Sequence, residues 1–348
     1  MKIRMGQRKL FEENDRLSKL SKLKDPLERL DSEVNWESFR LIIDKAFPVT
    51  DAKKGGRPAY DRVMLFKILV LQQYYELSDE RTEYQILDRL SFMRFLGLTL
   101  ADQVPDSKTI WHYREKLTQK SLLDELFDHL TSRLEELALI VHKGKIVDAN
   151  IVRAPIQRNS RNENDQIKEG EIPEDWSANK RAQKDTDANW TKKRNVSYFG
   201  YKNHVKVDSE SKLITDFQVT PANVHDSEVL EELLDDKDKN QPLWADSAYK
   251  SEKHDEMLER LEIENQISEK GSRNHALTPE QIESNRIKSK TRSRVEHIFG
   301  LQHQVQGISK VRRIGLKRAV GQITLRNFVY NLTTAIRLIK IQGIGMSL

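Results

Sequence analysis

The hydrophobic pattern of this chain changes once, near Gly144, and the change constrains the fold more than any other feature. Before it, apolar residues follow helical spacing, and residues 63–71 (VMLFKILVL) are so apolar that we expect a core helix there. After it, short β-branched runs alternate with helical segments. The sequence therefore predicts an all-α N-terminal domain over residues 1–140, a mixed α/β domain over 141–340 and a tail at 341–348.

The second half predicts a mixed sheet with helices packed on it. We expect strands over residues 145–152, 198–207, 212–219, 242–246 and 262–267, the second and third forming a hairpin. We expect helices over residues 224–234, 249–261, 286–303 and 317–339. Residues 155–195 are polar and predict a long loop or small insertion that is partly disordered. Its two tryptophans, Trp176 and Trp190, either pack locally or stack on bases.

The composition excludes several classes of protein. The chain has no cysteine, which excludes disulfides, thiolate zinc sites, iron–sulfur clusters and cysteine nucleophiles. It has no apolar run near the roughly 18 residues that a membrane span needs. The charged start of the chain lacks the apolar stretch of a secretory signal. We therefore expect a cytoplasmic protein with no membrane partner.

The charge is distributed unevenly. Residues 286–340 contain 13 Lys and Arg but a single acid, Glu296, whereas the rest of the chain has 46 basic and 53 acidic residues. A basic segment on an acidic remainder indicates a polyanionic partner such as DNA. The alternative is an ordinary solvated helical face.

Three carboxylates stand at positions where a mixed sheet can bring them together. Asp148 and Asp246 end predicted strands, and Glu296 lies in a late helix. Such oxygen ligands suit Mg²⁺ or Mn²⁺, and two ions about 4 Å apart can promote phosphodiester cleavage. The alternative is that each acid caps a strand or pairs with a nearby base, and the pattern alone does not decide.

The surroundings of Glu296 favour a functional role. On a continuous helix Arg292 and His303 share its face. One hypothesis is a structural Arg292–Glu296 pair. The other makes Glu296 a metal ligand, with Arg292 and His303 facing DNA phosphate, because an acid is otherwise unfavourable on a DNA-binding face.

The N-terminal half contains a second possible DNA-binding feature. Predicted helices at residues 83–96 and 107–117 follow one another after a short turn, with Asp106 or Ser107 as the N-cap of the second. This resembles a helix-turn-helix, in which Lys108 and Arg114 would face DNA. An ordinary helical hairpin is an equally good interpretation.

At these residues the chain resembles the bacterial insertion-sequence transposases of the DDE type, specifically the insertion-sequence 5 family. Five strings carry the resemblance in order: residues 146–152 (IVDANIV), 198–204 (YFGYKNH) with Val207 and Asp208, 221–226 (PANVHD), 245–249 (ADSAY) and 292–299 (RSRVEHIF). Residues 56–58 (GRP), 105–106 (PD) and 109–110 (TI) resemble the N-terminal domain of that family. At two positions the chain departs from the related signature: Ser289 stands in place of a tyrosine and His303 in place of a lysine.

The resemblance implies a ribonuclease-H-like catalytic domain in which Asp148, Asp246 and Glu296 hold two Mg²⁺ (or Mn²⁺) ions. It implies binding of terminal inverted repeats, metal-dependent strand cleavage and strand transfer, with a homodimer pairing two DNA ends. The residues predicted to contact DNA are Arg292, Arg294, His303, Lys310, Arg312, Arg313, Lys202, His204, Lys108 and Arg114. Lys202 and His204 are equally consistent with core or surface roles, and Asp226 is expected to cap a helix.

Two alternatives remain at this point. One is a transposase-derived DNA-binding protein without catalytic activity. The other is a nuclease of the same fold that cuts DNA without joining it.

Overall fold

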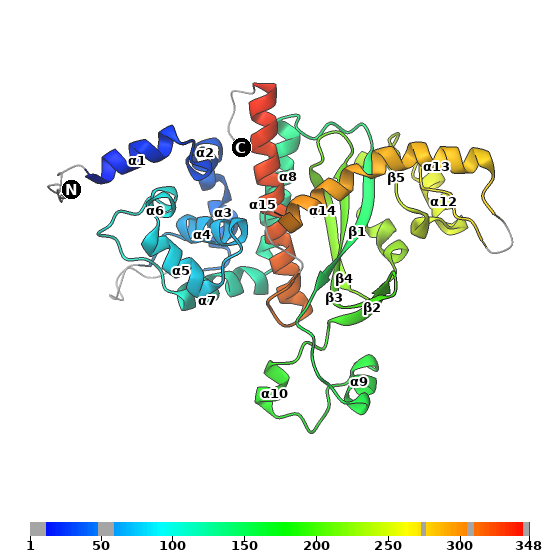
Figure 1. Ribbon diagram of the computed structural model, residues 1–348, viewed down its shortest axis with the longest axis horizontal. Helices are drawn as coiled ribbons and strands as arrows, with labels where there is room; N and C mark the ends of the chain where they lie inside the picture. The colour runs from blue at the N-terminus through cyan, green and yellow to red at the C-terminus, as the bar shows by residue number, and fades with distance from the viewer. Residues whose placement is uncertain (1–11, 48–58, 273–275, 305–309, 344–347) are drawn as a thin grey trace, which may run out of the picture. The chain divides into compact units, whose positions relative to one another are not determined.

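The computed structural model describes residues 12–47, 59–272, 276–304, 310–343 and 348, and these fall into two compact units (Figure 1). The first contains the described residues up to Leu117 together with Leu348, and the second begins at Thr118. This division comes earlier than the predicted boundary at residue 140. The reason is that helix α8 (Leu122–Glu136) packs against helix α15 (Leu316–Gln342) in the second unit.

The first unit is helical. Its elements are α1 (Glu12–Lys22), α2 (Pro26–Glu33), α3 (Arg40–Asp44), α4 (Arg62–Tyr74), α5 (Asp79–Asp88), α6 (Leu90–Leu96) and the start of α7 (Ser107–Gln119). Asp61 caps α4 by accepting a hydrogen bond from the Met64 amide, and eight of the nine residues from 63 to 71 are buried, as expected of a core helix. The ring of Trp36 lies edge-on against Phe66 and Phe95.

The predicted helix over residues 83–96 is interrupted. Arg89 adopts an extended conformation, so α5 ends at Asp88 and α6 starts at Leu90. Residues 56–58, which carry part of the family resemblance, lie outside the described residues.

The second unit is built on a mixed sheet, to which the described residues contribute six strands: β1 (Lys145–Arg153), β2 (Asn189–Lys193), β3 (Val196–Asp208), β4 (Ile214–Pro221), β5 (Pro242–Trp244) and β6 (Glu264–Asn265). The long β3 pairs with β2 along its first part and with β4 along the rest. Its other edge pairs with β1, which is antiparallel to β3 and parallel to β5. The order β4-β3-β1-β5-β6, three antiparallel strands followed by two parallel ones, confirms the predicted ribonuclease-H-like fold.

Apolar clusters cover both faces of this sheet. Val147 and Val152 point to opposite faces because side chains alternate along a strand. Val152 packs in a cluster with Ala319 and Ile323 of α15. Val147 packs with Leu230 and with residues of α12 (Glu252–Arg260). Asp148 points to the same face as Val152, which α15 covers.

Helix α15 is held to the sheet by buried amides as well as by apolar contacts. The side chains of Asn327 and Asn203 exchange hydrogen bonds of 3.1 and 3.2 Å. Asn331 bonds both the amide and the carbonyl of Ile214, at 2.9 and 2.7 Å. These bonds satisfy polar groups that would otherwise be costly to bury and fix the position of α15 along the sheet.

The predicted helix over residues 286–303 is instead two helices. Helix α13 (Pro279–Arg292) starts earlier, because Thr278 and Gln281 form a capping box in front of Pro279. It ends at Arg292 with Ser293 as its C-cap, and α14 (Arg294–Gln304) follows. The predicted helix over residues 224–234 is also shorter than expected, consisting of a 3₁₀ turn (Asp226–Val229) and α11 (Leu230–Leu233).

Of the two interpretations of residues 155–195, a long loop or a small insertion, the structure shows a small insertion, and its described residues form regular elements. The segment contains α9 (Arg161–Lys168), α10 (Ala178–Ala182) and strand β2, and Figure 1 shows α9 and α10 projecting beyond the end of the sheet. Glu163 organises it by accepting hydrogen bonds from Trp176 Nε1 and Lys180 Nζ, both at 2.6 Å. Trp176 is buried and therefore packs locally, whereas Trp190 stays 47% exposed beside Phe199. Short polar helices with side-chain caps give little hydrophobic signal, which is why the sequence pattern missed them.

No helix in the described part of the chain is long and apolar enough to span a bilayer.

Candidate active site

Asp148 and Asp246 come from neighbouring parallel strands. Ile146 of β1 pairs with Trp244 of β5, and each aspartate lies two residues farther along its own strand direction. The register therefore places Asp148 and Asp246 next to one another at the edge where both strands lead. Asp246 caps the 3₁₀ turn Ser247–Tyr249 by accepting a hydrogen bond of 2.8 Å from the Ala248 amide.

The surroundings of Asp148 disfavour the ionised form of its carboxyl. Burial raises the pKa of its carboxyl to about 6, and the charge of Asp246 acts in the same direction. The Ala149 amide, 2.8 Å from Asp148 Oδ1, partly offsets this rise, as do the charges of Arg292 and Lys193. A desolvated carboxylate beside a second carboxylate is a favourable place for an added cation.

Arg292 supplies the nearest positive charge to Asp148. Its Nη1 atom lies 3.7 Å from Asp148 Oδ2, and its Nε is buried without a hydrogen-bond partner among the described residues. The hypothesis of a structural Arg292–Glu296 pair is wrong for the described residues, because Arg292 approaches Asp148 and forms no ion pair with Glu296.

Glu296 is not grouped with the two aspartates as a metal-binding cluster in the described part of the chain. It is exposed in the first turn of α14 and lines a surface hollow of about 400 Å³ with Ser293, His297, Gly300 and Leu301. Within the described ranges, no three His, Asp or Glu side chains are grouped closely enough to hold one metal ion.

The donor set therefore fits a divalent metal in part. Asp148 and Asp246 offer hard oxygen atoms at the ends of adjacent strands, and that of Asp148 is desolvated, which suits Mg²⁺ or Mn²⁺. Glu296 does not join them in this arrangement.

Some residues predicted to contact DNA are exposed. Lys108 is exposed on α7, and Lys310 and Arg312 are exposed between α14 and α15. Arg294 is 39% exposed and donates to the Ser209 carbonyl at 2.7 Å and to Glu210 at 3.1 Å. Their role in DNA binding stays a prediction, as does that of the half-buried Arg313. The side chain of His303 lies outside the described residues.

Three other predicted contacts are wrong because their side chains are buried. Arg114 makes two hydrogen bonds of 2.7 Å to Asp79 and is 4% exposed. His204 has no exposed surface, and burial lowers its pKa to about 4, so it is neutral near physiological pH. Lys202 Nζ contacts Asp226 Oδ1 and the Val224 carbonyl, both at 2.6 Å. None of the three side chains is free to contact phosphate.

The contact with Lys202 also corrects the predicted role of Asp226. The N-cap of the following turn is His225, whose Nδ1 accepts from the Ser227 amide. Asp226 instead balances the buried Lys202 charge.

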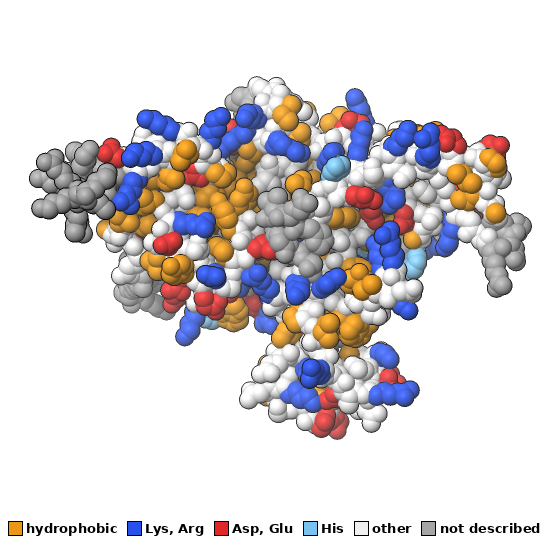
Figure 2. Space-filling model, in the orientation of Figure 1, with side chains coloured by type: hydrophobic (Ala, Val, Ile, Leu, Met, Phe, Trp, Pro, Cys, Tyr) orange, Lys and Arg blue, Asp and Glu red, His pale blue; other side chains and the backbone are white. Residues whose placement is uncertain are grey.

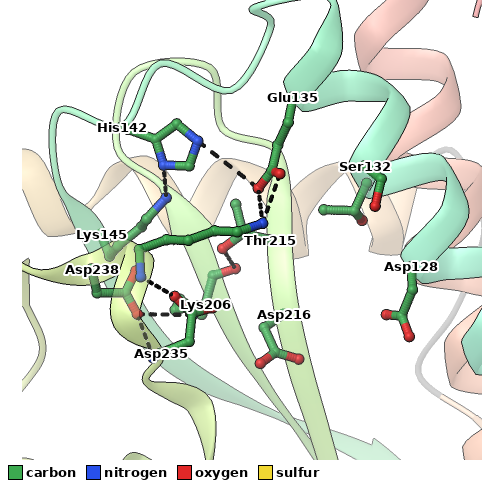
Figure 3. A pocket seen from close by; sticks show the side chains of 12 residues that line it. Asp128, Ser132, Glu135, His142, Lys145, Lys206, Thr215, Asp216, Asp235 and Asp238 are labelled. Atoms are coloured by element: carbon green, nitrogen blue, oxygen red, sulfur yellow. Dashed lines mark hydrogen bonds and ion pairs between the residues drawn. The ribbon is translucent and has the colours of Figure 1, made fainter.

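A buried ion network that the sequence did not predict lies on the face of the sheet opposite to Asp148 (Figure 3). Lys206 is 1% exposed and bonds Asp235 and Asp238, both at 2.9 Å. Asp216 faces the same hollow, and burial raises its pKa to about 6. Charged and apolar residues alternate along β3, and this pattern could have indicated that one face of the strand carries charged side chains. The same pattern is equally typical of a strand with a solvent-exposed face, so it does not predict a buried ion network.

Comparisons with protein families agree with this architecture. Residues 15–116 match a family described as "Transposase domain (DUF772)", and residues 141–332, more than half of the chain, match the family described as "Transposase DDE domain". The chain belongs to the DDE transposase family. This transposase is also similar to a piggyBac transposase, seen by cryo-electron microscopy in a synaptic complex with hairpin DNA. The two chains are 10% identical, the match covers 91% of this chain and 74% of that one, and the TM-score is 0.44.

Sequence reasoning missed one group of charged residues near the site of this transposase. Lys192, Lys193 and Arg194 are consecutive and exposed at the turn between β2 and β3. In the sequence these three cations are followed directly by Asn195, a residue that favours turns, and this pattern is consistent with charges at the tip of a hairpin. The polar composition of residues 155–195 predicts a loop or a small insertion, so these cations have no strand signal around them.

Proposed function

We propose that this DDE transposase is of the insertion-sequence 5 type, binds the terminal inverted repeats of its element and catalyses strand cleavage followed by strand transfer. The observation that carries the proposal is the register of β1 and β5, which sets Asp148 beside Asp246 at one sheet edge. The five strings of the sequence resemblance fall on this framework, with the arginine and the glutamate of the last string at Arg292 and Glu296.

In this proposal Asp148 and Asp246 hold divalent metal, and Glu296 completes the donor set when DNA is bound. Mg²⁺ or Mn²⁺ supplies Lewis-acid activation of a phosphodiester and of the attacking oxygen. The protein holds the aspartates in register through β1 and β5, and the Ala149 and Ala248 amides orient their carboxylates. Arg292 compensates the charge of Asp148 and is placed to contact a phosphate beside it.

The break at Ser293 supports this role for Glu296. Because α13 and α14 are separate helices, α14 can change its orientation without disturbing Arg292 at the end of α13. We propose that DNA binding brings Glu296 toward the aspartates, and that the active complex is a homodimer with two paired ends.

The experiment is a cleavage and joining assay with purified full-length protein. The substrate is a labelled duplex that ends in the inverted repeat flanking the gene, incubated with Mg²⁺ or with EDTA. We expect nicking at the repeat boundary with Mg²⁺, joined products when target DNA is added, and neither with Asp148→Ala. Cleavage without joined product would favour a nuclease, and binding without cleavage would favour a DNA-binding protein derived from a transposase. Either result would contradict the proposal.

A further inference from the structure

The hairpin of β2 and β3 ends in a group of cations that form no hydrogen bond or ion pair with another described residue. We call Lys192, Lys193 and Arg194 the hairpin tip. All three side chains are exposed, and none forms a hydrogen bond or ion pair with another described residue. Many other basic side chains of this unit are paired, as Lys180 is with Glu163 and Lys237 with Glu135. Three adjacent positive charges repel one another, so a negatively charged partner stabilises them.

The hairpin tip is held rigidly. Lys193 pairs with Val196, leaving Arg194 and Asn195 as a two-residue turn with φ of 48° and 63°. Positive φ at both positions is what a tight turn matching the twist of the strands requires. Asn tolerates this conformation, whereas an arginine there costs some strain. A paired hairpin with such a turn presents its charges at a fixed place.

The hairpin is joined to the strand that carries Asp148, because Gly200 of β3 pairs both with Asn189 of β2 and with Arg153 of β1. The positive charge of Lys193 is also among those that lower the pKa of Asp148. Lys193 forms no ion pair with another described residue, so its ammonium group stays available to an incoming anion. Figure 2 shows basic and acidic side chains next to one another on this part of the surface, over β1 and β2.

Further cations continue from the hairpin toward the C-terminal basic segment. Arg153 at the end of β1 pairs with Gly200 of β3, and its guanidinium lies 4.8 Å from the ring of Tyr198. The backbone of Lys310 forms an isolated parallel β-bridge with that of Arg153. In this pairing the Val311 amide donates a hydrogen bond of 2.7 Å to the Arg153 carbonyl. Both cations are exposed. Together with the hairpin tip they form what we call the basic track.

We infer that the basic track binds the phosphate backbone of the DNA strand that enters the candidate active site. A series of exposed cations on adjacent strands fits a linear polyanion better than a single small anion. Trp190, 47% exposed on the same hairpin, adds a ring face on which a base can stack. The inference rests on the proposed function for the identity of the polyanion as DNA.

The first experiment measures how binding depends on salt. The variant is Lys192→Gln/Lys193→Gln/Arg194→Gln, and its matched control is Lys143→Gln/Lys253→Gln/Lys270→Gln, which removes the same charge from exposed positions elsewhere in the unit. Binding of each full-length protein to a short duplex of mixed sequence is followed by fluorescence anisotropy over a range of KCl concentrations. Exposed side chains without partners are not needed for folding, and thermal unfolding verifies this.

Each phosphate contact contributes about 0.9 to the slope of log K against log salt concentration, so we expect the hairpin-tip variant to lose roughly two to three units of slope. We expect less than about one unit of loss in the control. A wild-type slope in the hairpin-tip variant, or an equal loss in the control, would overturn the inference.

The second experiment locates the DNA directly. Because the chain has no cysteine, Ser197→Cys places a single thiol on the hairpin, and Lys253→Cys places one on α12. An iron chelate attached to each thiol cuts nearby DNA backbone. We expect strong local cutting from position 197 and little from position 253. Equal cutting from both positions would contradict the basic track.

These results are independent of cleavage by the enzyme. If the protein never cuts DNA but the hairpin tip carries the salt dependence, the proposed chemistry fails and the basic track stands. If the wild type cleaves and the hairpin-tip variant binds like the wild type, the basic track fails and the chemistry stands.

Discussion

Arg292 Nη1 lies 3.7 Å from Asp148 Oδ2, which links the end of α13 to the middle of β1. The guanidinium is thus placed where a metal ion or a phosphate would also be attracted. An arginine at this distance lowers the pKa of a carboxyl by favouring its charged form, as it does for Asp148.

Arg292→Gln tests this relationship. Without the arginine, the pKa of Asp148 rises further, so protons compete with metal up to a higher pH. We expect the pH midpoint of Mn²⁺ binding, measured by calorimetry, to move upward by about one unit. Arg294→Gln is the control, because Arg294 pairs with Glu210 instead. An unchanged midpoint in Arg292→Gln would show that the contact with Asp148 has no energetic role.

Asp216→Asn tests the buried carboxyl on the opposite face. Its folded pKa of about 6 lies above the ordinary value of 3.8, so the folded protein binds more protons between these values and loses stability as the pH rises through them. Replacing the carboxyl with an amide removes that loss. We expect the variant to be more stable than the wild type by roughly 1 to 3 kcal/mol near neutral pH and the difference to vanish near pH 4. Denaturant unfolding at several pH values measures this, and a difference independent of pH would contradict it.

Lys206→Ala tests the ion network of Figure 3. Lys206 is the ammonium partner of Asp238, whose side chain is 1% exposed. Its removal leaves a buried carboxylate without compensation, which typically costs about 3 to 5 kcal/mol. The double variant Lys206→Ala/Asp238→Asn removes the stranded charge, so we expect it to recover part of the loss. Equal unfolding free energies for the single and double variants would argue against the network.

Gly200→Ala tests the junction between the hairpin and β1. Gly200 has φ of 152°, and a β-carbon there would collide with the backbone of Val152 and Arg153. The strand must shift, and we expect a loss of about 2 to 4 kcal/mol in the free energy of unfolding. Gly300→Ala is the control, because open space surrounds that position and its helical backbone suits alanine. A neutral effect at Gly200 would show that the close approach of β1 and β3 is not required.

Much of the framework was predictable from the sequence because it depends on local patterns. The β-branched run around Asp148 predicts strand β1, and the spacing of apolar residues predicts helix α15. The two aspartates were predicted from their positions at the ends of expected strands. The carboxyl ends of neighbouring parallel strands lie at the same edge of a sheet, so the proximity of the two aspartates could be predicted without knowing any other tertiary contact.

The remaining features depend on partners that are distant in the sequence. From its sequence position Arg114 is expected on the surface, but its ion pair with Asp79 buries it. His204 is likewise a polar side chain that would be expected on the surface, but it is buried because its strand is covered. The break at Ser293 has no glycine or proline to indicate it. It separates Glu296 from Arg292, which the helical periodicity had placed on one face.

The most direct test of the central claim is the Mg²⁺-dependent nicking rate of Asp246→Asn on the terminal-repeat duplex, with DNA affinity measured in parallel. If Asp148 and Asp246 form the metal-holding pair of a strand-cleaving transposase, nicking falls by at least about a hundredfold while the affinity stays within about twofold of the wild type. Nicking at the wild-type rate would contradict the account, because the carboxylate beside Asp148 would then have no part in the chemistry.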